Sequence, residues 1–412
     1  MVMLNSARIA GHFNLQVADL DGDGGPALLA EAATIGGDVT LGGGVAARGP
    51  VGMSGTSIGG ELDMSGAILS GRIGRERDGV ASEFCDAFHG RNLSVGSDTF
   101  LSDGFIAHGC VWLDGARIGG HLDLRGATLA GTIPNQYKDK FAVRRGAAFL
   151  PSTTTITALS CSDMSVGGCA RIGSRRSSRP NARMFCAHGS VNLQRASVGK
   201  DLDIINARIA RTPSESSDLP VLDLGWAAVS GTLIFEANNL DGVVHLEHAS
   251  TNVLSDDKDG YKNATNLALN GFRYETFHEP PGDRDRKSET KIVEKRKAWL
   301  RRMRPYRPQP YANLASVFMR HGRSDEARDI LVEKYRRERE VLIALIAGAV
   351  AQTARQGCRH RTALRGILAL GPAVRLRPQA VAGRDDADLR IPRRLGLLPR
   401  RQYAARDGHR SA

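Results

Sequence analysis

The sequence predicts a mainly β protein built as a parallel β-solenoid, and two observations support that prediction. The first is an internal repeat: residues 34–71 align with residues 94–131 at a constant offset of 60, with 17 identities in 38 positions. The second is a shorter period of about eleven residues inside each copy, at which apolar residues recur. Self-similarity at a fixed period is typical of stacked arrays. It favours a scaffold over an enzyme.

The eleven-residue unit is clearest in residues 116–126, which read ARIGGHLDLRG. The alternation in Leu122-x-Leu124 is typical of a half-buried strand, and the glycine pairs supply corners between short strands. A helix disfavours so many glycines, because each interior glycine costs about 0.5–1 kcal/mol relative to alanine.

A single unit cannot bury its own apolar residues, so successive units must stack, with parallel strands roughly 4.8 Å apart. We expect like side chains to form columns inside the stack, and we prefer two units, about 22 residues, for each coil. The predicted inward column consists of Ile35, Ile58, Leu69, Ile118 and Leu129.

The array extends over most of the chain. A third copy, from Val191 to Ile209, lies 80 residues beyond Val111 to Leu129, so it implies an insertion of about 20 residues. We expect loops within residues 132–160 and 173–187. Weaker units continue to Phe272, which gives a predicted repeat domain of residues 1–272.

Charge is unevenly distributed along the chain. The net charge of +12 divides into −6 for residues 1–286, +8 for residues 287–340 and +10 for residues 341–412. The basic character therefore belongs to the C-terminal third, while the repeat region is mildly acidic. Nucleic-acid binding by the array itself is not indicated.

The six cysteines show no CxxC pair and no spacing typical of metal ligands, so we interpret them as buried thiols in a reducing compartment. The N-terminal residues resemble half a repeat rather than a signal peptide. Together these features predict a cytoplasmic protein.

Helical periodicity replaces the strand pattern from Lys287. Pro308 and Pro310 open a first helix that ends at Gly322, and Ser324 begins a second helix with acidic residues in its first turn. The pair is similar to a single tetratricopeptide hairpin. We predict a helical module at residues 287–340 that packs as a cap or docking piece on the end of the solenoid.

Residues 341–412 differ abruptly in composition, with 14 arginines but no lysine or glutamate. Their apolar run, Val341 to Ala351, is shorter than the roughly 20 residues that span a bilayer. We interpret this tail as disordered or loosely helical. A second hypothesis is a C-terminus misread from a GC-rich coding sequence.

The repeat and the helical segment together resemble a known family. The sequence GARIGGHLDLRGATLAG at residues 115–131, the loop at residues 20–28 and the segment Arg307 to Tyr311 before GRSDEAR are similar to an uncharacterised bacterial family of pentapeptide-like repeat proteins. Its members are often labelled membrane-associated proteins or oxidoreductases. The resemblance covers about residues 1–340 and implies a β-solenoid, a short helical module and then C-terminal transmembrane helices.

Motifs for catalysis are not found in the sequence. It has no GxGxxG at a strand-to-helix junction, no Gly-x-Ser-x-Gly elbow, no HExxH and no Walker loop. We therefore expect no catalytic, cofactor-binding or metal-binding residues. The alternative is an enzyme, an oxidoreductase by family label only, with its site in the predicted insertions.

Two patterns resemble metal sites. Asp19, Asp21 and Asp23 resemble the start of a calcium loop, but Ala30 occupies the position of the bidentate carboxylate, so we interpret them as a turn. His108 and His188 occupy matching places, and their separation of 80 residues predicts that they lie on different coils.

Two charged patterns are candidate surfaces. Asp63, Asp123 and Asp203 recur between inward apolar residues, as in a phosphate-mimicking face, but the dilute charge of the repeat region favours a solvated face. A candidate basic surface, with Trp299 and Tyr306 interleaved, could bind acidic lipids or RNA, or could be a solvated helix. Its residues are Lys291, Lys295, Arg296, Lys297, Arg301, Arg302 and Arg304.

The sequence as a whole favours a non-enzymatic scaffold whose long faces bind a protein partner, at the cytoplasmic face of the membrane if the resemblance extends to location. The enzyme hypothesis remains open. So does binding of acidic lipid or nucleic acid through the basic C-terminal end, with nucleic acid the less favoured ligand.

Overall fold

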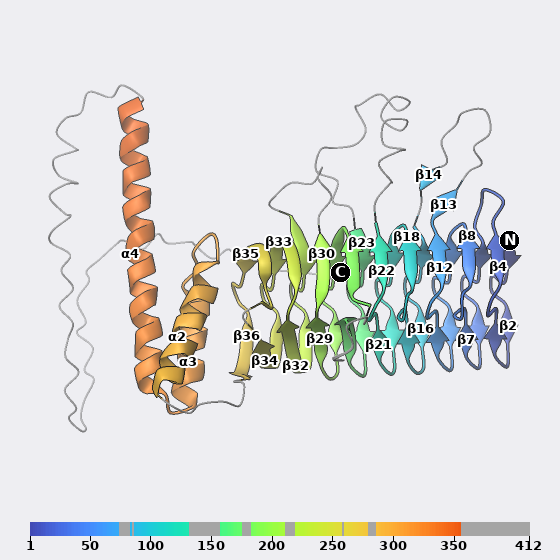
Figure 1. Cartoon of the computed structure of the whole chain (residues 1–412), viewed down its shortest axis with the longest axis horizontal. Helices are drawn as coiled ribbons and strands as arrows, with labels where there is room; N and C mark the ends of the chain where they lie inside the picture. The colour runs from blue at the N-terminus through green and yellow to red at the C-terminus, as the bar shows by residue number, and fades with distance from the viewer. Residues whose placement is uncertain are drawn as a thin grey trace, which may run out of the picture. The chain divides into compact units, whose positions relative to one another are not determined.

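The computed structural model describes residues 1–73, 83–84, 86–131, 157–174, 183–210, 219–257, 259–278 and 286–355. In these residues the chain is mainly β, and two all-parallel sheets of 17 strands each are followed by three helices (Figure 1). The predicted parallel solenoid is confirmed. Most of both predicted insertions lies outside the described residues, as does the tail beyond Arg355.

The strands of both large sheets are short near the N-terminus and longer toward the helices. The first sheet contains β1 (Val2–Met3), β4 (Asp19–Asp21), β5 (Leu28–Leu29), β8 (Ala46–Arg48), β9 (Val51–Gly52), β12 (Ile68–Ser70), β15 (Phe88–His89), β18 (Ile106–His108), β19 (Val111–Trp112), β22 (Thr128–Ala130), β23 (Thr157–Ser160), β26 (Phe185–His188), β27 (Ser190–Asn192), β30 (Ala207–Ala210), β31 (Pro220–Asp223), β33 (Asn239–His245) and β35 (Lys262–Ala268).

The second sheet contains β2 (Arg8–Ile9), β3 (Phe13–Asn14), β6 (Thr34–Ile35), β7 (Val39–Thr40), β10 (Ser57–Ile58), β11 (Leu62–Asp63), β16 (Ser94–Val95), β17 (Thr99–Phe100), β20 (Arg117–Ile118), β21 (Leu122–Asp123), β24 (Ser165–Val166), β25 (Ala170–Gly173), β28 (Ser197–Val198), β29 (Leu202–Ile205), β32 (Ala228–Glu236), β34 (Ser250–Asp256) and β36 (Arg273–Phe277). A small antiparallel pair, β13 (Arg72–Ile73) and β14 (Glu83–Phe84), stands apart from both.

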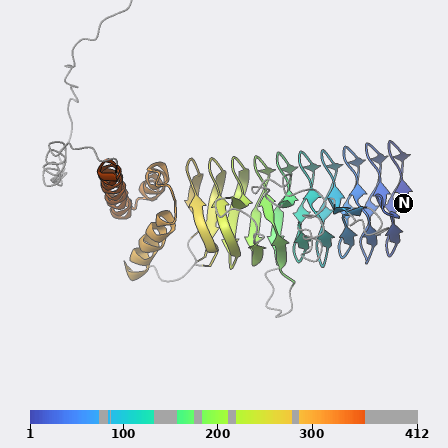
Figure 2. The same ribbon diagram turned by 90° about the horizontal axis from the view of Figure 1, so that it is seen from above.

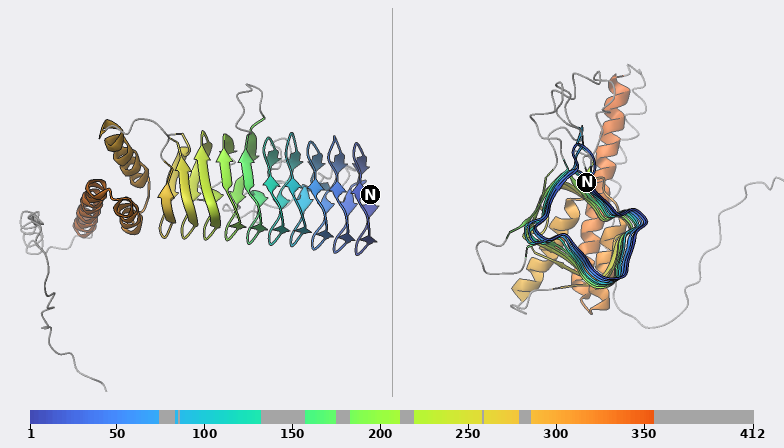
Figure 3. Two further views of the ribbon diagram at one scale, coloured as in Figure 1. Left: turned by 90° about the horizontal axis from the view of Figure 1, so that it is seen from below. Right: turned by 90° about the vertical axis from the view of Figure 1, so that its right-hand side faces the viewer.

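Strand pairing shows how the repeat builds the stack. Ser94 of β16 pairs with Arg117 of β20, a step of 23 residues, so the eleven-residue unit is half a coil. Thr34 pairs with Ser57, which in turn pairs with Ser94, so the 60-residue repeat corresponds to two coils. The expected two units per coil are confirmed. Seen along the stack, the coils superimpose in a four-sided outline (Figure 3).

The interior of the stack is a continuous apolar column. All five residues of the predicted inward column are buried, at most 2% exposed, but they belong to two columns rather than one. Leu69 and Leu129 align through Ala107 in the first sheet, and the three isoleucines align in the second. Ile35, Ile58, Val95 and Ile118 occupy the same register position on four consecutive coils. Burying such a side chain contributes about 1.5–3 kcal/mol relative to leaving it in water, so the column is the main source of the stack's stability.

A column of glycines sets how closely the coils approach one another. A Cβ added to Gly59, Gly96, Gly119 or Gly167 would lie less than 3.0 Å from the carbonyl oxygen of the corresponding glycine one coil earlier. Because the obstructing atom belongs to the backbone, no side-chain movement can relieve the clash. The recurrent glycine of the repeat is therefore required by contact between coils as well as by the bend at the corner.

The helices follow the last coil. The array runs to Phe277, slightly beyond its predicted end, and leads to α2 (Arg286–Arg301), α3 (Gln309–Arg320) and α4 (Ser324–Arg355). Helices α3 and α4 form the predicted hairpin, and Gly322 between them has a φ of 73°, which closes α3. Helix α4 continues past residue 340 through the apolar run, which is rich in good helix formers.

Aromatic and aliphatic side chains of the helices close the apolar column at the end of the stack. Trp299 of α2 lies 6.5 Å from the rings of both Phe272 and Tyr274, and Phe318 of α3 lies 5.3 Å from Phe277, measured between ring centroids. The helices and the last coils thus share one hydrophobic cluster. Figure 2 shows the helices following the last strands along the stack.

Polar side chains of the helical segment complete the backbone hydrogen bonding of the last coil. Along one corner, Trp226 N donates to Glu247 O and His248 N donates to Asn270 O, both at 2.9 Å. At the next position Gly271 N donates to the side-chain Oε1 of Gln309, again at 2.9 Å. A side chain of α3 therefore takes the place that a further coil would fill.

A buried ion pair fixes α2 to the stack. Arg296 is 2% exposed, and its Nη2 lies 2.9 Å from Oδ1 of Asp256 at the end of β34. Lys295 Nζ donates to the Asp256 backbone oxygen at 2.7 Å. Removing one partner of such a pair leaves the other charge buried without compensation, which typically lowers the free energy of unfolding by about 3–5 kcal/mol. The contact therefore specifies where α2 lies.

The glycine column yields a direct test of coil stacking. We expect Gly119→Ala to lower the free energy of unfolding by about 1–3 kcal/mol, because the added methyl group meets the backbone of the preceding coil. Gly11→Ala, where a Cβ would meet nothing within 4 Å, serves as the control. Urea unfolding followed by circular dichroism measures both, and equal stability of the two variants would refute the steric account.

Candidate functional site

The candidate basic surface is divided by the structure rather than gathered into one patch. Arg296 and Lys295 contact Asp256, as described above, and Arg302 Nη2 donates to the backbone oxygen of Tyr261 at 2.8 Å. Burial lowers the pKa of Arg302. These three side chains join α2 to the solenoid. The side chain of Lys291 lies outside the described residues.

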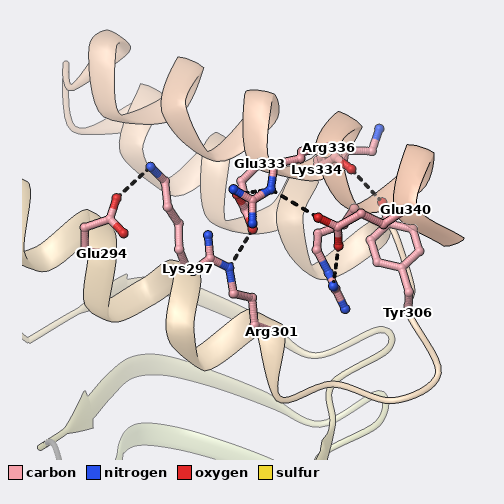
Figure 4. Close-up of polar contacts among 9 residues, drawn as sticks. Glu294, Lys297, Arg301, Tyr306, Glu333, Lys334, Arg336 and Glu340 are labelled. Atoms are coloured by element: carbon pink, nitrogen blue, oxygen red, sulfur yellow. Dashed lines mark hydrogen bonds and ion pairs between the residues drawn. The ribbon is translucent and has the colours of Figure 1, made fainter.

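Two further members of the predicted surface are paired inside the helical module (Figure 4). Lys297 Nζ lies 2.9 Å from Glu294, and Arg301 Nε donates to Glu333 at 2.7 Å. The pairing with Arg301 lowers the pKa of Glu333, against the effect of burial. Arg304, which is exposed, belongs to a different location described below.

The regularly spaced acids do not form a continuous acidic face. Asp63, Asp123 and Asp203 lie on alternate coils, and Phe100 and Arg171 occupy the register positions between them. Asp123 is 2% exposed and forms an ion pair with Arg125, and this pairing lowers the pKa of Asp123 although burial raises it.

The predicted turn at Asp19 to Gly24 forms, with Asp21 Oδ1 accepting the backbone N–H of Asp23 at 2.8 Å. Arg48 of the next coil lies 2.6 Å from Asp19. Among the described residues, no group of three or more potential metal ligands comes together.

The matching histidines lie on different coils, as predicted. His108 pairs with Ala130, and Ala130 pairs with His188 one coil further on.

The described cysteines are structural thiols. Cys161 and Cys169 are buried, and Cys110 and Cys186 are partly buried, each with a free thiol. Burial raises the pKa of the Cys110 thiol to about 12 and also raises that of Cys161. Thiols with raised pKa values are poor nucleophiles at neutral pH. Cys85 and Cys358 lie outside the described residues.

The structure reveals a feature that the sequence analysis missed, a line of polar and aromatic side chains along one side of the first sheet. We call it the polar row. Its members are consecutive register partners, one on each of six coils, so they repeat at the spacing of about 4.8 Å between strands. They are His89, Trp112, Ser160, Asn192, Asp223 and His245.

A cation–π contact, an ion pair and hydrogen bonds hold Trp112 and Ser160 in the first half of the polar row. The guanidinium of Arg91 lies 4.2 Å from the ring centroid of Trp112 and 3.5 Å from Asp114. Asp114 Oδ1 accepts hydrogen bonds from Ser160 Oγ at 2.5 Å and from the backbone N–H of Ser162 at 2.9 Å. These contacts connect the side chains of two neighbouring coils.

The second half of the polar row ends in a titratable group. His245 Nδ1 lies 2.8 Å from Asp223 Oδ1, and its Nε2 lies 3.3 Å from Glu247 Oε2. The hydrogen bond to Asp223 raises the pKa of His245, assisted by the charges of both carboxylates and opposed by burial. The imidazolium form is therefore favoured, since both ring nitrogens face acceptors.

A pocket of about 270 Å³ opens at this end of the polar row. Its floor is formed by His245 and the neighbouring strands, and its wall by the connection between α2 and α3, which includes Arg304 and Arg307. Two hydrogen bonds hold the wall in place: Arg304 N donates to Asn266 Oδ1 at 2.8 Å, and Asn266 Nδ2 donates to Arg304 O at 2.6 Å.

The sequence held only a weak signal for this site. The repeat units Leu222-Asp223-Leu224 and Val244-His245-Leu246 place Asp223 and His245 at the same outward position of neighbouring units. Their pairing could have been inferred from the alignment of these two units. The insertions between earlier coils conceal the same register for the rest of the polar row.

Comparison of the chain with protein-family models, curated proteins and solved structures finds no match. The resemblance to the pentapeptide-like repeat family therefore stays a prediction. Among the described helices, none is both long and apolar enough to cross a membrane.

The environment of His245 predicts a pH-dependent stability. Because its folded-state pKa is raised above the ordinary value of 6.5, its contribution to the free energy of unfolding is complete below about pH 6.5 and is lost as the pH rises through the folded-state pKa. We expect His245→Asn to remove this decline, whereas substitution of the exposed His278 by Asn should preserve it. Thermal unfolding between pH 5.5 and about 9 tests this, and identical pH profiles for all three proteins would contradict it.

Proposed function

We propose that the protein is a non-enzymatic repeat scaffold that binds a protein partner along the face carrying the polar row. The observation that supports this proposal is the arrangement of that row: side chains recur at regular spacing on six successive coils, and five of the six are partly exposed. Several of them are held by hydrogen bonds to each other or to neighbouring side chains. A preorganised surface loses little side-chain entropy on association, which favours affinity.

The composition of the face also supports a protein partner. The Arg91 guanidinium lies over the Trp112 ring, and tryptophan and arginine are two of the three residue types enriched at energetically important positions of protein interfaces. Asn192 and Asp223, which are partly exposed, add hydrogen-bonding groups that can give specificity, whereas Ser160 is buried and supports the row through its hydrogen bond to Asp114. The enzyme alternative places its site in the insertions, most of which lie outside the described residues, and it stays a separate hypothesis.

The test uses the full chain as bait and changes one face at a time. We expect Arg91→Ala to reduce capture of a partner at least about fivefold, equivalent to about 1 kcal/mol, because it removes the group that covers Trp112. Arg117→Ala on the second sheet, also an exposed arginine, should leave capture unchanged. Quantitative mass spectrometry of the captured proteins measures the ratio. Equal loss in both variants, or no protein enriched over the bare matrix, would contradict the proposal.

We further propose that α4 attaches this scaffold to the cytoplasmic face of an acidic membrane. Leu342, Ile343 and Leu345 are each more than half exposed. They follow the exposed Arg339 on the same helix and Arg336, which forms ion pairs with Glu333 and Glu340. Exposed apolar residues beside basic residues favour the interface of an anionic bilayer. Attachment of this kind lies on the membrane rather than across it.

Vesicle flotation tests the attachment. The full chain should float with vesicles that contain phosphatidylglycerol and much less with phosphatidylcholine alone, and the triple variant Leu342→Ser/Ile343→Ser/Leu345→Ser should lose most of its binding. The double variant Val332→Ser/Tyr335→Ser changes two other exposed residues of α4 and should still float. Binding by the triple variant that equals the wild type would exclude this mode of attachment.

A further inference from the structure

The pocket at the end of the polar row combines three features that a binding site requires. It is concave, its wall is anchored to its floor through Asn266, and it places charged groups beside apolar ones. Its volume of about 270 Å³ lies just below the range of about 300–1,000 Å³ typical of ligand pockets. A ligand of one ring or a short chain therefore fits better than a nucleotide.

The charges around the pocket favour an anion with a single charge. Arg304 and Arg307 border it from the α2–α3 connection, and within the described part of the chain neither guanidinium forms an ion pair. His245 faces the pocket between the carboxylates of Asp223 and Glu247. With His245 protonated, these five groups carry three positive and two negative charges, which leaves a surplus of one positive charge.

Apolar side chains complete the lining. Val243 and Leu269 border the pocket on the solenoid side, and Met303 and Pro305 border it on the helical side. Such a lining accommodates a small apolar body, while the arginines accept the charged end. Arginine binds a carboxylate through two parallel N–H···O hydrogen bonds, which adds geometric selectivity to charge.

We propose that this pocket binds a small amphiphilic monocarboxylate, with its carboxylate held by Arg304 and Arg307 and its apolar body resting against Val243 and Met303. A dianion is disfavoured because Glu247 and Asp223 repel a second negative charge. Deprotonation of His245 removes the surplus positive charge, so binding weakens as the pH rises. The inference is independent of any protein partner on the polar row.

The test uses benzoate as the probe, with the full chain and isothermal titration calorimetry at pH 6. Benzamide has the same shape as benzoate but no charge, so it tests the need for the carboxylate. Phenyl phosphate gains a second negative charge as the pH rises, so it tests the preference for a monoanion. We expect benzoate to bind at least tenfold more tightly than benzamide, and its advantage over phenyl phosphate to grow between pH 6 and pH 7.5. Benzamide binding as tightly as benzoate would overturn the carboxylate assignment, and no heat from any probe would overturn the site.

Variants locate the binding event. Arg304→Gln and Arg307→Gln should each weaken benzoate binding at least fivefold, Arg304→Lys should retain part of the affinity, and Arg273→Gln on the second sheet should match the wild type. Circular dichroism confirms that the variants are folded. Benzoate affinity unchanged in both glutamine variants would place binding elsewhere on the molecule and overturn the proposal.

Discussion

The constraint on which this structure depends is that every coil of a parallel solenoid leaves a row of backbone donors and acceptors, which the next coil or a cover at the end of the stack must satisfy. Inside the stack, the repeat meets this need because each strand pairs with its counterparts on the neighbouring coils. After Phe277, the described residues form helices and no further strand. An exposed edge of this kind would pair with other chains, so the end must be covered.

The helical module covers the C-terminal edge by three means at once. Aromatic rings centred on Trp299 close the apolar column, the ion pair between Arg296 and Asp256 fixes α2, and side chains such as Gln309 accept the hydrogen bonds of the last coil. The same cover creates the pocket, because the connection between α2 and α3 crosses the end of the polar row. The helical module therefore both caps the stack and forms one side of the candidate binding site.

The sequence predicted the parts of the fold that are periodic. The inward column of Ile35, Ile58 and Ile118 could be recognised because the core requires similar side chains on each coil. The end of α3 could be recognised at Gly322 because glycine readily adopts the positive φ that follows a helix. Outward positions are under no such demand, so the polar row has a different residue on nearly every coil. Arg296 could not be recognised as buried, because its partner Asp256 lies 40 residues away and a basic helix is usually solvated.

Hydrogen exchange of the Gly271 amide tests the central claim most directly. Its N–H donates to the Gln309 side chain, whereas the equivalent amides of Trp226 and His248 donate to backbone carbonyls of the next coil. In the variant Gln309→Ala, the account predicts faster exchange at Gly271 with little change at Trp226. Unchanged exchange at Gly271 would show that the side chain does not complete the ladder, and would contradict the account.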